Sequence, residues 1–321
     1  MIEEMGGYFE FEHYKKNAYH KNSIALNTGR NCLRYLIRAK KIQKIFLPDF
    51  VCEVVVEACR MENIEIHFYQ VNRLFRPQNI EKIGNDDYIY VINYYGQLSN
   101  ENILQMAKIF PNIIIDNAQA FFQKPVSGVD TIYTCRKFFG VTDGAYLYTD
   151  HEMDVRLEKD MSYQRMEYLL GRYECGANKF FEAYQDNEKR LSGQQIKRMS
   201  SLTENILKSI DYAVVSKIRE DNYDVLEDNL GSFNMLQLRK ASGPYMYPFM
   251  VKNGNALRKK LIARKIYIPV LWPNIVENCE NQSDAYFMAN NILPLPCDQR
   301  YTKENMIEMI EIIKGEMEEI E

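Results

Sequence analysis

The amino-acid sequence predicts an α/β protein of two domains, a large one on a mostly parallel sheet and a smaller C-terminal one. Three observations lead to this prediction. Residues 24–150 alternate short apolar runs with segments of helical periodicity, the pattern of a sheet with crossover helices. Residues 216–321 carry a second, shorter α/β pattern. The chain has 321 residues, 46% of them hydrophobic, which is enough for one large core or two modest ones.

The elements of the large domain, predicted at 1–215, follow one another in regular order. Apolar runs predict strands at 45–48, 64–71, 88–96, 112–116, 131–135 and 145–149. Helical spacing of apolar residues predicts helices at 29–41, 51–59 and 103–110. Residues 151–215 are charged and largely helical in pattern, which predicts a long helix that bridges the two domains.

The smaller domain is predicted at 216–321, with the boundary near residue 215. Its pattern indicates a strand at 245–251, a helix at 255–264, a strand at 265–271 and a final helix. Thr302 is a suitable N-cap for that last helix. Its apolar face carries Met306, Ile307, Met309, Ile310 and Ile313.

Composition and charge exclude several classes of protein. The net charge of −4 and the lack of a long basic run argue against nucleic-acid binding. No apolar stretch approaches the roughly 20 residues of a membrane helix, so no membrane partner is expected. The acidic start does not resemble a signal peptide, and seven scattered cysteines are typical of a reducing compartment, so we expect a cytoplasmic protein. The four histidines are not spaced as metal ligands, so no metal is expected.

Two charged residues stand at the ends of neighbouring predicted strands. Asp116 ends the isoleucine-rich run 112–116, and Lys137 follows the strand 131–135. Ligands collect at the carboxyl ends of parallel strands, so both side chains can enter one pocket. The flanking Cys135, Phe138 and Phe139 predict that Lys137 is partly buried. The alternatives are an exposed lysine and an aspartate that caps the following segment.

Pyridoxal phosphate (PLP) needs a lysine and an aspartate in this arrangement. The lysine binds the cofactor's aldehyde as a Schiff base, and the carboxylate keeps the pyridine nitrogen protonated. Burial or the neighbouring cation Arg136 would lower the pKa of the Lys137 amine and favour that bond. Gln119, three residues after Asp116, could reach the ring hydroxyl.

Further candidates surround this pair. Thr28 and Gly29 begin a predicted helix, whose N-terminus suits a phosphate, although ordinary capping gives the same pattern. Thr134 is placed to donate a hydrogen bond to the same phosphate. Tyr94 and Tyr95, at the end of the strand 88–96, either line a substrate pocket or pack in the core.

Taken together, these segments resemble the DegT/DnrJ/StrS-type sugar aminotransferases. The matching segments are Asn27-Thr28-Gly29, Asp116 with Gln119, Lys137 followed by Asp143-Gly144, and the late runs 266–273 and 292–296. The resemblance implies the type I PLP-dependent transferase fold, with a mostly parallel seven-stranded sheet and a smaller C-terminal α/β domain. It also implies that Lys137 is catalytic and that Asn27, Thr28, Gly29, Asp116, Gln119 and Thr134 bind the cofactor.

The sequence departs from the family pattern at several positions. The usual Glu-Gly-Gly reads Asp143-Gly144-Ala145. Phe50 is the nearest candidate for the aromatic residue that stacks on the cofactor ring, but the aligned position also fits Cys52. Family members are homodimers whose sites borrow an asparagine from the partner subunit, and Asn187 is the match for it.

The resemblance implies a transaminase that transfers an amino group, with glutamate as the expected donor, to a nucleotide-linked keto-deoxysugar. Such reactions belong to the biosynthesis of surface polysaccharides and related amino sugars. Two other functions stay open. One is a PLP-dependent sugar dehydratase on the same fold, and the other is a non-catalytic binding or regulatory homologue. Retention of Lys137 and the absence of a clustered cysteine set argue against the dehydratase.

Overall fold

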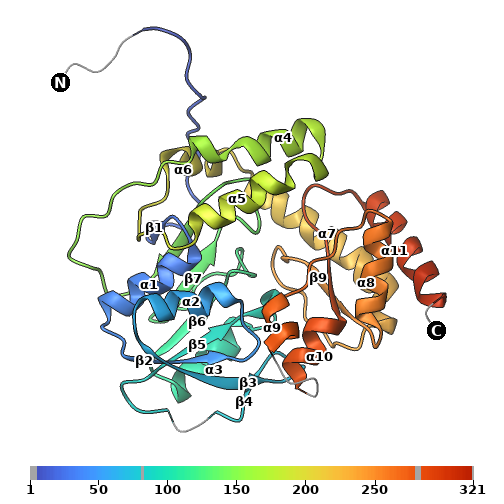
Figure 1. Cartoon of the computed structure of the whole chain (residues 1–321), viewed down its shortest axis with the longest axis horizontal. Helices are drawn as coiled ribbons and strands as arrows, with labels where there is room; N and C mark the ends of the chain where they lie inside the picture. Colours follow the sequence, from blue (N-terminus) through green and yellow to red (C-terminus); the bar gives the residue numbers. More distant parts are fainter. Residues whose placement is uncertain (1–5, 81–82, 279–282, 320–321) are drawn as a thin grey trace.

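The computed structural model describes residues 6–80, 83–278 and 283–319, and its main feature is a sheet of eight strands (Figure 1). Their order is β1-β8-β7-β6-β5-β2-β3-β4. Five neighbouring strands run parallel: β2 (Lys44–Pro48), β3 (Glu65–Val71), β5 (Tyr88–Ile92), β6 (Ile113–Asp116) and β7 (Asp130–Thr134). The remaining three pair antiparallel with their neighbours: β1 (Ile24–Leu26), β4 (Pro77–Gln78) and β8 (Ala145–Tyr148). The α/β class is confirmed, whereas the count of seven strands is wrong because the two-residue β4 extends one edge.

Helices cover both faces of this sheet. In Figure 1, α1 (Gly29–Ala39) and α2 (Glu53–Met61) lie in front of the strands and α3 (Asn100–Ile109) lies behind them. The branched residues of β5 and β6 are buried between these layers, as expected of strands that are covered on both faces. Because the five strands are parallel, their carboxyl ends lie along one edge of the sheet, and the loops that follow them can build a site there.

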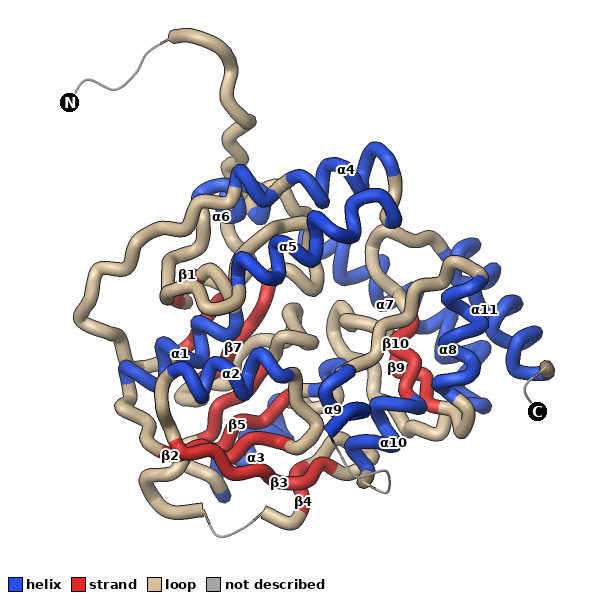
Figure 2. Tube along the Cα trace, viewed as in Figure 1, coloured by secondary structure: helices blue, strands red, loops and turns tan. Residues whose placement is uncertain are grey.

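Residues 151–215 do not form one long helix, so that prediction is wrong. Three short helices lie there, α4 (Glu167–Cys175), α5 (Phe181–Leu191) and α6 (Ser201–Leu207), separated by loops (Figure 2). Gly176 and Gly193, with φ of 93° and 70°, follow α4 and α5 in a conformation that favours glycine and breaks a helix. The long helix is α7 (Tyr212–Leu230), and the predicted boundary near 215 falls inside it.

The C-terminal elements pack around a two-stranded antiparallel sheet of β9 (Tyr247–Met250) and β10 (Ile292–Leu295). They are α8 (Gly254–Ala263), α9 (Pro273–Asn278), α10 (Asp284–Asn291) and α11 (Lys303–Glu318). Thr302 caps α11 as predicted, and its side chain accepts a hydrogen bond from the Asn305 N–H. The strand predicted at 265–271 is wrong, because this segment is irregular and pairs with no described strand. Pro269 has no N–H to give to such a ladder.

Two of the hydrophobic clusters account for most of the core. One contains the large sheet with α1 and α2 and extends to residues of α9 and α10, such as Ile275 and Met288, and the other joins α7, α8 and α11 to β9 and β10. Short 3-10 turns complete the fold: η1 (Tyr94–Gly96), η2 (Tyr163–Arg165), η3 (Asn178–Phe180) and η4 (Gly231–Phe233). Within the described ranges, no helix is both long and apolar enough to cross a bilayer.

Candidate active site

Lys137 and Asp116 lie together at the carboxyl edge of the sheet. Asp116 is the last residue of β6 and pairs with Ile132 of the neighbouring β7, and Lys137 follows β7 by three residues. Burial raises the pKa of the Asp116 carboxyl, and the positive charge of Lys137 lowers it in opposition. The Lys137 side chain itself is exposed, so the predicted partial burial is wrong, although Phe138 and Phe139 beside it are buried.

The Asp116 carboxylate is held in a fixed orientation. One oxygen accepts a hydrogen bond from the Tyr90 hydroxyl at 2.8 Å, and the other accepts one from the Ala118 N–H at 2.8 Å. Only 7% of the residue is exposed. A buried carboxylate needs such donors, and these two leave Lys137 as the cation that acts on it.

The N-terminus of α1 lies beside this pair. The Thr28 hydroxyl accepts the Asn31 N–H at 3.2 Å and caps the helix. The backbone N–H groups of Gly29 and Arg30 make no hydrogen bond to any described residue. A Cβ atom on Gly29 would lie 3.8 Å from Ile132, so the helix starts close against β7. Free N–H groups and the helix dipole together make a site that suits an anion.

Cys52, rather than Phe50, faces this group of charges. It is the N-cap of α2 and is half-buried. Burial raises the pKa of the Cys52 thiol, while the charges of Lys137 and Arg30 lower it. Its thiol therefore lies within electrostatic reach of both cations.

Phe50 and the two tyrosines are core residues in this structure. The Phe50 ring stacks on Tyr94 with centroids 5.3 Å apart and meets the edge of Trp272 at 5.2 Å. The Tyr94 hydroxyl donates to the Phe50 carbonyl at 2.5 Å. Tyr95 is buried too, with φ of 51° in the η1 turn, and its N–H donates to the Gln119 amide oxygen at 2.8 Å. Tyr94 and Tyr95 therefore pack in the core, which was one of the two interpretations of their sequence positions.

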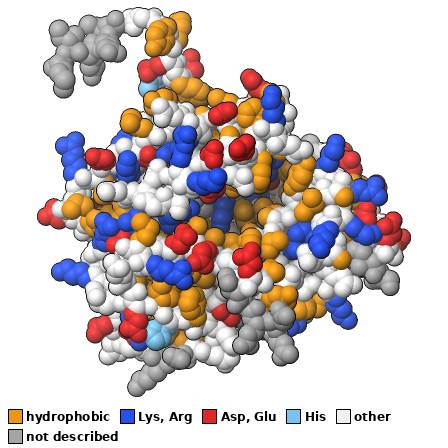
Figure 3. Space-filling view, in the orientation of Figure 1, with side chains coloured by type: hydrophobic (Ala, Val, Ile, Leu, Met, Phe, Trp, Pro, Cys, Tyr) orange, Lys and Arg blue, Asp and Glu red, His pale blue; other side chains and the backbone are white. Residues whose placement is uncertain are grey.

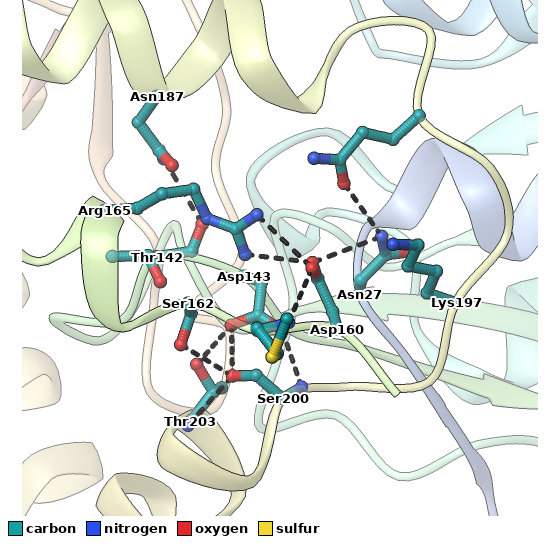
Figure 4. A network of polar contacts seen from close by, with 12 residues as sticks. Asn27, Thr142, Asp143, Asp160, Ser162, Arg165, Asn187, Lys197, Ser200 and Thr203 are labelled. Atoms are coloured by element: carbon teal, nitrogen blue, oxygen red, sulfur yellow. Dashed lines mark hydrogen bonds and ion pairs between the residues drawn. The ribbon is translucent and has the colours of Figure 1, made fainter. Parts of the chain in front are cut away.

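The remaining candidates take different places. Thr134 ends β7, is half-buried and pairs with Ala145. Asn27 and Asn187 are buried in a polar network, shown in Figure 4. The Asn27 amide donates to Asp160 at 3.4 Å, and the Asn187 amide donates to the Thr142 carbonyl at 3.2 Å. Both side chains are thus placed inside their own subunit.

Asp143 organises the lower part of that network (Figure 4). It accepts hydrogen bonds from the Ser200 N–H at 2.8 Å, the Ser200 hydroxyl at 2.7 Å and the Thr203 hydroxyl at 2.5 Å. The next residue, Gly144, has φ of +113° and donates its N–H to the Asn27 carbonyl at 2.5 Å. These bonds fix the loop after Lys137 to the segment that leads into α1.

Sequence reasoning missed two residues that hold the lysine loop from the other side. Arg219 of α7 is fully buried and donates to the carbonyls of Phe138 at 3.2 Å and Pro244 at 2.9 Å. The Tyr245 ring centroid is 5.6 Å from Lys137 Nζ. Arg219 stands among charged residues of a helix, which is the pattern of a solvent-exposed face, so no sequence signal could have found it.

Comparison with known proteins finds similarity in structure only. No protein-family model matches the sequence, and no curated protein matches it significantly. Solved structures do match. A DegT DnrJ EryC1 StrS aminotransferase from Brucella abortus superposes with a TM-score of 0.62 at 15% identity, over 93% of this chain and 86% of that one. The chain has the aminotransferase fold.

Two further structures support the same aminotransferase fold. The sugar aminotransferase CalS13 from Micromonospora echinospora matches with a TM-score of 0.63 at 14% identity, over 91% of this chain and 87% of that one. NtdA from Bacillus subtilis, solved with bound cofactor PMP, matches with a TM-score of 0.63 at 14% identity, over 91% of this chain and 73% of that one. The predicted fold is therefore confirmed.

The chemical character of the site fits the cofactor of such a fold. PLP presents an aldehyde, a basic ring nitrogen and a phosphate. The site offers the Lys137 amine, the Asp116 carboxylate and the N-terminus of α1 with the nearby Arg30 guanidinium. Figure 3 shows the front face hollowed near its centre, with a basic side chain at its floor. Among the described residues, no three His, Cys, Asp or Glu side chains gather as metal ligands would.

Proposed function

We propose that this protein is a PLP-dependent aminotransferase that transfers an amino group to a nucleotide-linked keto-deoxysugar. One observation carries the proposal: the buried carboxylate of Asp116 ends β6, and Lys137 follows the end of the neighbouring parallel strand β7, in a chain with the aminotransferase fold. An exposed lysine amine and a buried carboxylate together provide the two groups that this cofactor needs.

Each residue has a defined role in this proposal. Lys137 would hold the cofactor through its Nζ, Asp116 would keep a proton on the ring nitrogen, and the α1 N-terminus with Arg30 would bind the phosphate. When bound, the cofactor supplies an electron sink for the bond that is broken at the substrate Cα. The Lys137 amine, when it is not bonded to the cofactor, would take the proton from the substrate Cα as general base and give it back as general acid. Gln119 and Thr134 are proposed as further cofactor contacts.

Several finer points belong to the same proposal. We expect glutamate as the donor, a cytoplasmic location and a role in polysaccharide or amino-sugar biosynthesis. CalS13 is described as a sugar aminotransferase, which supports a sugar as the acceptor. We also expect a homodimer with shared sites. Support comes from large apolar side chains that α4 leaves exposed, at Leu170 and Tyr173. The large domain of residues 1–215 would bind the cofactor and residues 216–321 would close over it.

Cofactor attachment gives the most direct test. Purified protein incubated with PLP should turn yellow, and borohydride should fix the added mass on Lys137. The variant Lys137→Ala should bind PLP without covalent attachment and lose transamination, whereas Lys252→Ala, at an exposed lysine outside the site, should behave as the parent protein. A fully active Lys137→Ala variant would refute the proposal.

Asp116→Ala should retain PLP weakly and react slowly, and unchanged kinetics would remove Asp116 from its role.

A non-catalytic binding protein is the second candidate, and one observation favours it. Asn27 and Phe50, expected at the cofactor, instead form contacts inside the core and the buried network. Colourless protein that PLP cannot reconstitute would support this alternative. Colour without any response to glutamate would instead favour the dehydratase or another amino donor.

A further inference from the structure

A cavity of about 690 Å³ lies beside the candidate active site, between the α4–α5 connection and the elements that lead into α11. In Figure 1 the ends of α4 and α5 approach the C-terminal elements at this place. Its lining includes Met246, the neighbour in sequence of Tyr245, whose ring lies 5.6 Å from Lys137 Nζ. Through Met246 the cavity therefore adjoins the residue that contacts Lys137, and no residue assigned to the cofactor lines it. Its volume is within the range of about 300–1,000 Å³ that is typical of small-molecule sites.

The charges around this cavity are mostly positive. The charged residues of its lining are Arg172, Arg264, Lys265, Arg300 and Glu308. Arg264 and Arg300 are neutralised by carboxylates outside the lining, those of Glu316 at 2.8 Å and Asp298 at 2.7 Å. Arg172 and Lys265 form no ion pair with any residue that the structure describes. Two unpaired cations from opposite walls, against the single carboxylate of Glu308, leave the cavity with a net positive charge that suits an anion.

Flat aromatic groups line the same space. Phe181 stands on the α5 wall, Tyr267 on the loop after α8 and Tyr301 just before α11. The Tyr267 hydroxyl donates to the Asn178 amide oxygen at 2.9 Å, so this bond ties the two walls together and orients the Tyr267 ring. Aromatic faces next to cations are the combination that binds a nucleobase and its phosphates.

We propose that this cavity binds the nucleoside diphosphate part of the substrate, with Arg172 and Lys265 on the phosphates and Tyr267 against the base. The inference rests on the proposed function, which requires a nucleotide-linked sugar. It adds where the nucleotide lies and which residues hold it. The sugar end would then extend past Tyr245 toward Lys137, so the cavity sets the position of the ketone.

Calorimetric titration of the PLP-loaded protein tests the site without any reaction. The ligands are UDP, dTDP and GDP, with inorganic pyrophosphate as a probe that lacks the base. We expect at least one diphosphate to bind, and the double variant Arg172→Ala/Lys265→Ala to weaken it at least tenfold. Tyr267→Ala should weaken the nucleoside diphosphate but leave pyrophosphate unchanged. The matched control Lys259→Ala removes an exposed cation of α8 outside the cavity and should change neither affinity.

The outcomes separate this inference from the proposed function. If the double variant binds the diphosphate as tightly as the parent protein, the nucleotide lies elsewhere and the inference is overturned. The inference is also overturned if none of the three diphosphates binds. In either case, yellow protein with PLP fixed on Lys137 leaves the proposed function standing. A double variant that alters only the oligomeric state shows the cavity to be a subunit contact and also overturns the inference. Protein that takes up no PLP but loses diphosphate affinity in the double variant supports the site and refutes the aminotransferase.

Discussion

Replacing Arg219 by methionine tests whether this buried guanidinium holds the loop that carries Lys137. Methionine has a similar length and leaves little empty volume, so the change removes mainly the donors and the charge. The Phe138 carbonyl keeps the Gln299 amide as a donor at 2.8 Å. The Pro244 and Tyr245 carbonyls lose the guanidinium, which donates to them at 2.9 and 3.2 Å. Two buried acceptors without a good donor cost about 1–3 kcal/mol each.

A second effect acts in the opposite direction. Arg219 has no carboxylate partner at ion-pair distance among the described residues, and burial lowers the pKa of its guanidinium. Removing its charge therefore relieves a desolvation cost. Because the neutral replacement of buried charges often recovers some stability, we expect a net loss of about 2–4 kcal/mol in the free energy of unfolding.

Equilibrium denaturation in urea measures this loss, with Arg219→Lys as the comparison. Lysine keeps the charge but has one nitrogen in place of three, so its stability should lie between those of the parent and Arg219→Met. Both variants should also retain PLP less well, since the residue after Lys137 loses one of its anchors. An Arg219→Met protein as stable as the parent would refute the reasoning.

Three further predictions concern fixed positions in the fold. Burial lowers the pKa of His20 from 6.5 to about 4, so the imidazole is neutral in the folded state. The free energy of unfolding should therefore fall by about 3 kcal/mol as the pH drops from 6.5 to 4. Denaturation at several pH values should show a weaker fall for His20→Phe. Gly254→Ala would place a Cβ atom 2.4 Å from the Asn291 carbonyl oxygen and should lower the melting temperature, whereas Gly315→Ala in α11 meets nothing within 4 Å and should raise stability by about 0.5–1 kcal/mol. Asp143→Asn puts an amide donor opposite the donors of Ser200 and Thr203 and should lower the free energy of unfolding by about 2–3 kcal/mol. The variant should also lose PLP faster. Unchanged PLP retention would show that this network does not support cofactor binding.

Most strands and helices in residues 24–150 were predictable from sequence, because each has its own periodicity or cap, but the short strands β1 and β4 were not predicted. The placement of Asp116 and Lys137 at the ends of neighbouring strands was also predictable, since each is a charged residue that ends or follows an apolar run. Contacts between distant segments carry no such signal. The Arg219 bond to the Phe138 carbonyl spans 81 positions, and the Asp143 bond to Ser200 spans 57. Helical periodicity also could not show where Gly176 and Gly193 interrupt residues 151–215.

The pairing of β1 with β8 has a consequence for biosynthesis. Ile24 lies opposite Leu147, so the first strand emerges from the ribosome well before its partner exists. At roughly 5–20 residues per second, this delay is on the order of 10 s. During that time the apolar segment 24–26 and the start of α1 have no sheet to join. The strands β2, β3, β5, β6 and β7 can therefore pair before β1 does, and β1 joins the sheet only after β8 has been made.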